Sequence, residues 1–331
     1  MHPLSAFYKD KSALITGGLG FLGSNLAHSL VTLGARVTLS DALLPLYGGN
    51  MHNVRDIRKE VHLEFCDIRD SLSMERLVRG QDVIFHIAGQ TSHVDSMTEP
   101  LLDEEINCKG NLVFLEACRK WNPNAKIVYA GTRGQYGKLH STPVREDHPM
   151  EPVDIYGINK LAGESYHLLY GRVHGLRVVS LRINNTYGPR HQMKHGKYGI
   201  LNWFVRLALE DEAITVYGDG GQLRDYNYVD DVTEAFLLVG GRDEANGKAF
   251  NLGSGNPVRF MDMVKTLLSE AGSGRMVRIP WPRDRAAIEV GDYVADYSAI
   301  QSALGWEPRV GLPEGLKRTV EFYRQNKEFY W

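Results

Sequence analysis

A strand–turn–helix pattern near the N-terminus constrains this chain more than any other feature of its sequence. The apolar run Ala13–Thr16 is followed by Gly17, Gly20 and Gly23, and a helical pattern begins directly after Gly20. Gly17 permits a tight turn, Gly20 lets the backbone approach a phosphate group, and Gly23 lets a helix pack closely on a strand. Unpaired N–H groups of the first helical turn face the same ligand. The pattern therefore predicts a turn that binds a pyrophosphate.

Short apolar runs alternate with helical patterns through the first half of the chain. Nearly continuous apolar runs of this length are typical of strands that are buried on both faces. We expect strands at Ala13–Thr16, Val37–Leu39, Val61–Phe65, Val83–Ile87, Ile127–Tyr129 and Val178–Leu181. We expect helices at Phe21–Leu33, Ser73–Val78, Glu104–Lys120 and Tyr156–Val173. Repeated β–α units of this size predict an α/β fold built on a Rossmann-type, doubly wound parallel sheet.

The alternation stops after Leu181, and 331 residues are more than one core usually needs. We predict a dinucleotide-binding domain over residues 1–183 and a smaller C-terminal α/β domain made of residues 184–228 and 256–331. Residues 229–255 are expected to return to the first domain. Further helices are expected at Leu201–Glu210 and Val229–Val239, and further strands at Ala249–Leu252 and near Val277–Pro280.

The composition excludes several classes of protein. Lysine and arginine number 38 against 40 aspartates and glutamates, so no basic excess points to nucleic acid. Cys66, Cys108 and Cys118 are too few and too scattered for a disulfide framework or a zinc site. No apolar run approaches the roughly 20 residues that span a bilayer. We expect a cytoplasmic protein without a bound metal and without contact to a membrane.

Asp41 follows the second expected strand, about 20 residues beyond the glycine turn. A carboxylate there accepts hydrogen bonds from ribose hydroxyls and repels a 2′-phosphate, and Ala42 follows it where NADP-binding proteins place an arginine. The pattern favours NAD, with Phe21 and Leu22 at the start of the helix as further cofactor contacts. A turn residue without a ligand is the alternative for Asp41.

Two further strand ends converge on the same edge of the sheet. Asp67 and Ile68 follow the third run, where a carboxylate can meet the adenine amine. Ala88 and Gly89 follow the fourth, where small residues allow close approach of a cofactor. His86, before them, is expected to be a packed histidine.

Tyr156 and Lys160 stand four residues apart at the start of an expected helix, and therefore share one face. A neighbouring ammonium favours the phenolate and should lower the tyrosine pKa from about 10 toward neutrality. A phenolate can remove the proton of a sugar hydroxyl. Thr132, after the fifth strand, can share that proton. The alternatives are that Tyr156 and Lys160 form a pair on the protein surface and that Thr132 is a threonine at a strand end without a role in catalysis.

Taken in order, these motifs resemble the extended short-chain dehydrogenases/reductases of the NAD-dependent epimerase/dehydratase type. The resemblance covers nearly the whole chain. It includes the runs Leu181–Arg190 and Arg224–Asp231 as well as Thr132, Tyr156 and Lys160. It implies NAD as cofactor and a nucleotide sugar as substrate.

The resemblance also assigns residues. It implies that Asn107 orients the catalytic region beside the cofactor, that Asn185 contacts the sugar diphosphate, and that Arg224 pairs with the diphosphate or a ribose. A guanidinium also suits phosphate better than an ammonium does. The remaining substrate contacts implied are Arg190, Gln222 and Arg283, with Arg285 as the alternative to Arg283.

The departures from the family pattern concern the reaction. Sugar-nucleotide 4,6-dehydratases carry Asp-Glu directly after the catalytic threonine, and this chain has Arg133 and Gly134 there. Loss of both carboxylates argues against water elimination and favours epimerisation at C4 of a UDP-hexose or UDP-hexuronate through a transient keto sugar. A CDP-sugar 2-epimerase, a dehydratase or decarboxylase, and a non-catalytic NAD-sensing scaffold remain as alternatives.

Two surfaces are open to more than one interpretation. The basic segment 190–197 is either a solvated loop or a lid over an anionic substrate. In the family that the chain resembles, the helices equivalent to 104–120 and 156–173 pair across a two-fold axis. We therefore expect a homodimer. Apolar residues available for its interface, unless they are buried against the sheet, are Leu112, Val113, Leu115, Leu168 and Leu169.

Overall fold

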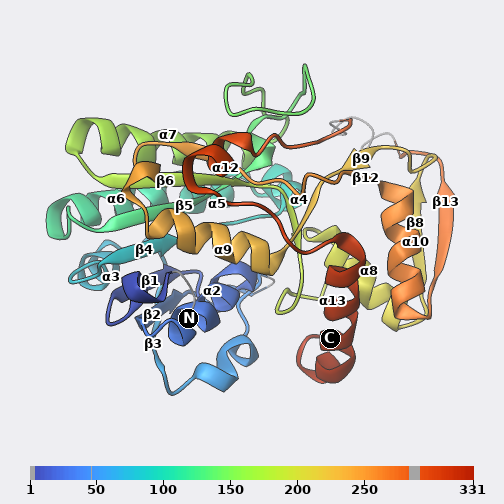
Figure 1. Cartoon of the computed structure of the whole chain (residues 1–331), viewed down its shortest axis with the longest axis horizontal. Coiled ribbons are helices and arrows are strands. Elements are labelled where there is room, and N and C mark those ends of the chain that lie inside the picture. Colours follow the sequence, from blue (N-terminus) through green and yellow to red (C-terminus); the bar gives the residue numbers. More distant parts are fainter. Residues whose placement is uncertain (1–3, 46, 283–290) are drawn as a thin grey trace.

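A seven-stranded parallel sheet forms the centre of the computed structural model, which describes residues 4–45, 47–282 and 291–331 (Figure 1). Its strands are β1 (Ser12–Thr16), β2 (Arg36–Asp41), β3 (Val61–Phe65), β4 (Val83–His86), β5 (Lys126–Thr132), β6 (Arg177–Ile183) and β11 (Ala249–Asn251). Their order is β11-β6-β5-β4-β1-β2-β3, and every neighbouring pair is parallel. This order confirms the predicted doubly wound α/β fold.

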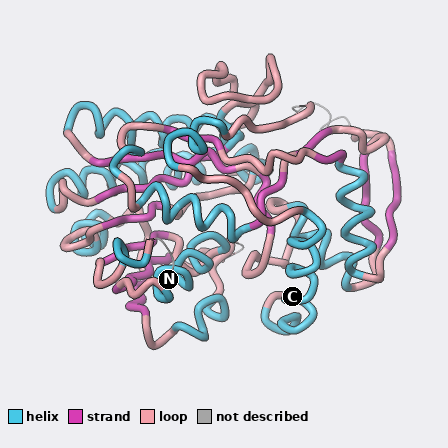
Figure 2. Tube along the Cα trace, viewed as in Figure 1, coloured by secondary structure: helices cyan, strands magenta, loops and turns pink. Residues whose placement is uncertain are grey.

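Helices cover both faces of the sheet, as Figure 2 shows by the strands that run between helical layers. One face packs on α2 (Phe21–Thr32), α9 (Val229–Gly240) and α12 (Ser298–Leu304), and the other packs on α3 (Ser71–Leu77), α6 (Gly110–Trp121) and α7 (Ile155–His174). Strand β1 shows why its sequence is apolar throughout. Ala13 and Ile15 belong to the first core, Leu14 belongs to the second, and all three are fully buried.

A separate core lies beside the carboxyl ends of the strands, at the right in Figure 1. It contains α8 (Ile200–Leu209), α10 (Phe260–Ala271) and α13 (Leu312–Asn326), with the parallel pair β8 (Ala213–Tyr217) and β13 (Arg275–Ile279). Helix α8 buries Leu201, Phe204, Val205 and Ala208, the spacing of one helix face. The remaining strands are β7 (Asn185–Tyr187) with β10 (Tyr226–Tyr228), and β9 (Leu223–Arg224) with β12 (Val258–Arg259).

Residues 229–255 lie with the large sheet, since α9 packs on α2 and β11 pairs with β6. The domain boundaries themselves stay a prediction. The other helices are α1 (Ser5–Tyr8), α4 (His93–Thr98), α5 (Pro100–Glu104) and short turns at Met51–Ile57, Arg133–Gln135, Asp243–Ala245 and Lys327–Phe329.

The structure differs from the sequence expectation at residues 104–120. The expected single helix is divided into α5, a π-helical turn at Glu105–Lys109 and α6. A π turn inserts a wider hydrogen-bonded loop, and single turns of this kind are frequent at functional sites. Leu115, expected to be available for a subunit interface, is fully buried in the core instead.

None of the helices in the described ranges is long and apolar enough to cross a membrane.

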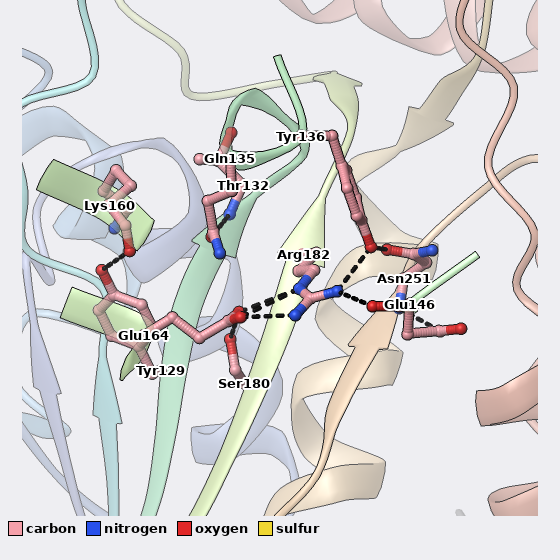
Figure 3. A network of polar contacts seen from close by, with 10 residues as sticks. All are labelled: Tyr129, Thr132, Gln135, Tyr136, Glu146, Lys160, Glu164, Ser180, Arg182 and Asn251. Carbon is pink, nitrogen blue, oxygen red and sulfur yellow. Dashed lines mark hydrogen bonds and ion pairs between the residues drawn. The ribbon is translucent and has the colours of Figure 1, made fainter. Parts of the chain in front are cut away.

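A buried ion pair ties α7 to the sheet (Figure 3). The Arg182 guanidinium on β6 contacts the Glu164 carboxylate on α7 at 2.7 Å, and both side chains are less than a tenth exposed. Ser180 donates to the same carboxylate, and Arg182 donates to the Tyr136 hydroxyl, each at 2.7 Å. Tyr136 in turn donates to Asn251 of β11 at 2.6 Å. Every charge in this network is therefore matched by a partner.

We predict that Glu164→Gln destabilises the protein by about 3–5 kcal/mol, because it leaves the Arg182 guanidinium buried without its counter-charge. Urea-induced unfolding followed by circular dichroism measures the loss. The control is Lys265→Ala, which removes the exposed pair with Asp262 on α10. It should cost less than about 0.5 kcal/mol. Equal midpoints for the two variants would contradict the prediction.

Candidate active site

One cavity of about 830 Å³ runs along the carboxyl ends of the strands and into the second core. Cavities of this size are typical of cofactor and substrate sites, and in doubly wound sheets they lie at this edge. Most residues predicted from the sequence line it, namely Gly17, Gly20, Phe21, Leu22, Asp41, Asp67, Ile68, Ala88, Gly89, Thr132, Tyr156, Lys160, Asn185, Gln222 and Arg224.

The glycine turn is so closely packed that no side chain fits at two of its positions. Gly17 has a φ of +71°, and a Cβ there would lie 3.0 Å from the backbone of Ala88. A Cβ on Gly23 would lie 2.2 Å from the Gly17 carbonyl oxygen. Gly20 caps α2 with extended backbone. The turn thus brings the start of α2 directly against the cavity, with Gly23 behind it.

Two carboxylates mark the neighbouring strand ends. Asp41 accepts hydrogen bonds from the backbone of Leu19 at 3.0 Å and of Leu43 at 2.9 Å. Burial raises its pKa, although these two hydrogen bonds oppose the shift. Asp67 differs because both of its oxygens already accept from the Arg69 guanidinium, at 2.7 and 3.0 Å. An adenine contact of Asp67 therefore competes with an existing ion pair and stays a prediction.

Asn107 lies behind Gly89 rather than in the cavity wall. The π-helical turn places its side chain so that Nδ2 donates to the Gln90 carbonyl at 3.0 Å. Its Oδ1 is buried and has no hydrogen-bond partner among the described residues. A Cβ on Gly89 would lie 2.9 Å from this oxygen. Because Gly89 has no side chain, nothing on that residue covers the Asn107 oxygen that lies behind it.

Thr132 and Tyr156 meet where β5 ends and α7 begins. The Thr132 hydroxyl accepts from the Gly134 backbone at 3.1 Å, and Gln135 accepts from the Thr132 backbone at 3.0 Å (Figure 3). Gly157 permits the close approach of α7, since a Cβ there would lie 2.7 Å from the Gly134 carbonyl oxygen. Tyr156 is buried, and the Thr132 side chain acts to lower its pKa.

The electrostatics of Tyr156 differ from the sequence expectation. Burial raises its pKa to about 12, opposed by the Thr132 hydrogen bond and the Arg133 charge. Lys160 donates instead to the Ala130 carbonyl at 2.6 Å, and burial lowers its own pKa to about 8. The expected lowering of the tyrosine pKa by Lys160 is therefore wrong for the protein alone. The physical reason is that both groups are buried and the ammonium is engaged by a backbone carbonyl.

Sequence reasoning missed a histidine–carboxylate pair in the same wall. His93 Nδ1 and Asp154 Oδ2 are 2.5 Å apart, and the imidazole packs edge-on against the Tyr156 ring with 4.8 Å between centroids. Burial opposes ionisation of Asp154, but the hydrogen bonds from His93 and the Gly157 backbone help to hold its pKa below the ordinary value. Asp154 also caps α7 by accepting from Gly157. That capping position, directly before a helical pattern, was the available signal.

The far end of the cavity combines polar and aromatic side chains. Asn185 Oδ1 accepts from Arg133 at 3.4 Å, and the Arg133 guanidinium lies 5.0 Å from the centre of the Tyr293 ring. Arg224 donates to the Gly291 carbonyl at 2.6 Å. Further lining residues that the sequence analysis did not single out are Trp203, Tyr217, Phe260, Trp281 and Tyr293.

Arg190 is the predicted substrate contact that the structure places elsewhere. It does not line the cavity, because its guanidinium donates to Asn25 Oδ1 at 2.8 Å and lies over Phe322. Arg283 and Arg285 lie outside the described residues.

The segment after Arg190 contributes to the cavity wall. His191, Gln192 and residues 196–201 line it, and Lys197 pairs with Asp95 of α4 at 2.8 Å. A fully solvated loop, one of the two interpretations of the sequence, does not describe this segment.

His86 is packed as expected. Its ring lies between Thr16 and Asn111, at 2.9 and 3.1 Å, and stacks on Phe114. Burial lowers its pKa well below the ordinary value. Within residues 4–45, 47–282 and 291–331, no group of three or more His, Cys, Asp or Glu side chains is arranged to hold a metal ion.

Comparisons with known proteins place this cavity in context. Residues 14–319 match the family described as GDP-mannose 4,6 dehydratase. The UDP-glucose 4-epimerase of Mycolicibacterium smegmatis is 32% identical over 320 residues, which are 95% of this chain and 99% of that protein.

Solved structures agree with this relationship. The UDP-glucose 4-epimerase of Thermotoga maritima with UDP-glucose superposes with a TM-score of 0.87 at 32% identity, covering 96% of this chain and 99% of that chain. The UDP-glucose 4-epimerase of Thermus thermophilus in complex with NAD gives a TM-score of 0.83 at 32% identity, covering 95% and 99%. This chain belongs to the extended short-chain dehydrogenases/reductases, in the family of NAD-dependent nucleotide-sugar epimerases and dehydratases.

Proposed function

We propose that this protein is an NAD-dependent nucleotide-sugar epimerase that inverts C4 of a UDP-hexose or UDP-hexuronate. One observation carries the proposal: Thr132, Tyr156 and Lys160 lie in one wall of a single cavity that extends from the glycine turn to Asn185 and Arg224. A proton-transferring group thus stands between a cofactor end and a substrate end. The relatives named as UDP-glucose 4-epimerases support the same reaction.

The residues at the cofactor end fit NAD. Gly17 and Gly23 leave no room for side chains where a pyrophosphate would approach α2. Asp41 presents a carboxylate, and its neighbour Ala42 carries no charge that would pair with a 2′-phosphate. When bound, NAD supplies reversible hydride transfer at a ring carbon and a positive charge on its oxidised ring.

The protein's own part in the reaction is to move one proton. We assign the Tyr156 oxygen as the base that takes the proton of the reacting hydroxyl and later returns it. In this assignment the Thr132 hydroxyl would donate to that oxygen, in line with its effect of lowering the Tyr156 pKa and so favouring the charged form. Arg133 acts in the same direction through its charge. We assign Lys160 to the ribose of the cofactor, since its ammonium lies in the wall beside Gly89.

The sugar nucleotide occupies the second-core end in this proposal. Asn185 and Arg224 there suit a diphosphate, because an amide and a guanidinium both donate hydrogen bonds to phosphate oxygens. Gln222 lies beside them in the wall. Arg190 has no part in this assignment.

Water elimination is the second candidate, because the matching family is described as a dehydratase. Elimination requires an acid and a base besides the tyrosine, and Arg133 and Gly134 supply neither in the manner of an Asp-Glu pair. The mass of the product separates the two reactions.

We also infer a homodimer formed through α6 and α7. Beyond the core contact of Leu115, apolar side chains remain exposed on these helices, with Leu169 44% and Val173 63% exposed. The three free cysteines fit a reducing cytoplasm.

We expect the wild-type protein to bind NAD far more tightly than NADP, and Asp41→Asn to reduce that preference by about 10- to 100-fold, because the 2′-phosphate no longer meets a carboxylate. Titration calorimetry on cofactor-stripped protein measures both affinities. The control is Asp67→Asn at the next strand end, which should leave the ratio unchanged. Equal affinities for wild type would overturn the assignment of Asp41.

We expect Tyr156→Phe to lower kcat by about 10²–10⁴-fold, because it removes the base and keeps the ring. Turnover of UDP-, CDP- and dTDP-sugars is followed by chromatography and mass spectrometry. The control is Tyr170→Phe on the same helix, which removes a hydroxyl that donates to Glu116 of α6. An epimerase yields two sugars of equal mass, whereas a product lighter by one water would establish elimination instead.

We expect light scattering at micromolar concentration to give the mass of a dimer. Leu169→Glu together with Val173→Glu should shift the protein toward monomer, since charges would be buried in the interface. Val277→Glu, on the exposed strand β13, is the control and should leave the mass unchanged. A wild-type monomer would refute the dimer.

A further inference from the structure

The His93–Asp154 pair has a geometry that the proposed proton transfer does not use. His93 begins α4 and Asp154 caps α7, so two elements 61 residues apart in the chain meet at this contact. Each end is anchored: Ser92 caps α4 by accepting from Asp95, and Asp154 accepts from Gly157 at 2.7 Å. The imidazole is therefore held in place by two helix starts, while its side chain remains 44% exposed.

Asp154 determines which ring nitrogen of His93 carries the hydrogen. An ionised carboxylate only accepts hydrogen bonds, so Nδ1 at 2.5 Å must be the donor. In the neutral ring, Nε2 is then left as an acceptor. No described residue forms a hydrogen bond with Nε2, and His93 belongs to the cavity wall. The cavity thus contains a pre-oriented nitrogen lone pair.

The position of this acceptor relates it to the reacting atoms. Gly134 separates His93 from Thr132, and the point where a side chain on Gly134 would begin is 3.4 Å from His93 Cε1 and 3.5 Å from Thr132 Oγ1. The ring of His93 also touches the ring of Tyr156. The imidazole of His93, the Thr132 hydroxyl and the Tyr156 ring therefore lie close together in one wall of the cavity.

We propose that His93 Nε2 accepts a hydrogen bond from a sugar hydroxyl next to the hydroxyl that Tyr156 deprotonates, and that Asp154 is the positioning residue that fixes the tautomer. The inference rests on the proposed function and adds a sugar contact to it. Neighbouring hydroxyls of a hexose point in different directions. One fixed acceptor beside the reacting oxygen therefore selects the orientation in which the ring can react.

The two roles are separated by variants that keep the fold. His93→Asn retains an amide nitrogen near Nδ1 for Asp154 but ends short of Nε2, whereas His93→Gln places a polar atom near Nε2. Asp154→Asn still caps α7, because asparagine is an equally good capping residue. Its amide donates to Nδ1, so Nε2 carries the hydrogen and no longer accepts. His62→Asn, which disrupts the exposed pair with Glu64 on β3, is the matched control.

The test compares a sugar nucleotide with its own nucleoside diphosphate, using the tightest-binding pair among UDP-glucose with UDP, CDP-glucose with CDP and dTDP-glucose with dTDP. Calorimetry at pH 8 should show that His93→Asn and Asp154→Asn each weaken the sugar nucleotide by about tenfold and leave the diphosphate unchanged. His93→Gln should recover part of this loss. In turnover, kcat/KM should fall by at least the same factor, and His62→Asn should behave as wild type.

The outcomes distinguish the two proposals. Equal weakening of both ligands, or no weakening of either, would overturn the role of His93 while leaving the epimerase assignment intact. A sugar nucleotide that binds in this pattern without being epimerised would overturn the proposed reaction and leave His93 as a sugar contact. Failure of all three sugar nucleotides to bind would overturn both.

Discussion

The ion pair of Arg182 and Glu164 holds α7 against the sheet. Arg182 sits on β6, Glu164 sits two turns after Tyr156 on α7, and the same guanidinium reaches Tyr136 beyond the end of β5 (Figure 3). Two charges inside an apolar core are stable only when they face each other with their hydrogen bonds filled. The requirement restricts α7 to one position along the sheet. That position places Tyr156 at Thr132 and the Lys160 ammonium at the Ala130 carbonyl.

Close packing at glycine residues also fixes the positions of helices, here through backbone contacts rather than through an ion pair between side chains. Gly23 lies against Gly17, and Gly157 lies against the Gly134 carbonyl. A side chain on Gly163 would begin 2.5 Å from the Tyr129 hydroxyl oxygen. At each place a helix approaches a strand or its following loop more closely than any side chain permits. These close contacts fix the positions of α2 and α7 beside the strand ends, where the cavity lies.

Burial works against ionisation of the group proposed as the base. The Tyr156 pKa is raised to about 12 by its surroundings, and the opposing contributions come from the Thr132 hydroxyl and the Arg133 guanidinium. A base of this kind gains its charged form only where positive charge is close, since desolvation penalises the phenolate. The Arg133 guanidinium supplies such charge, and NAD would add the positive charge of its oxidised ring when bound.

The sequence alone determined what depends on neighbours along the chain. Apolar runs predicted the seven strands of the sheet, including Ala249–Leu252 for β11, because strands that lie between two layers of helices are mostly apolar. The glycine turn, the strand ends and the Tyr156–Lys160 spacing identified part of the cavity lining, because strand ends in this fold share one edge. Contacts between distant segments needed the tertiary structure. Only packing of α4 on α7 brought His93 to Asp154, only the π-helical turn set Asn107 behind Gly89, and only the arrangement of the second core turned Arg190 toward Asn25. The sequence gives the chemical type of each side chain. Which group that side chain contacts depends on long-range packing, because residues far apart in the chain compete for the same partner.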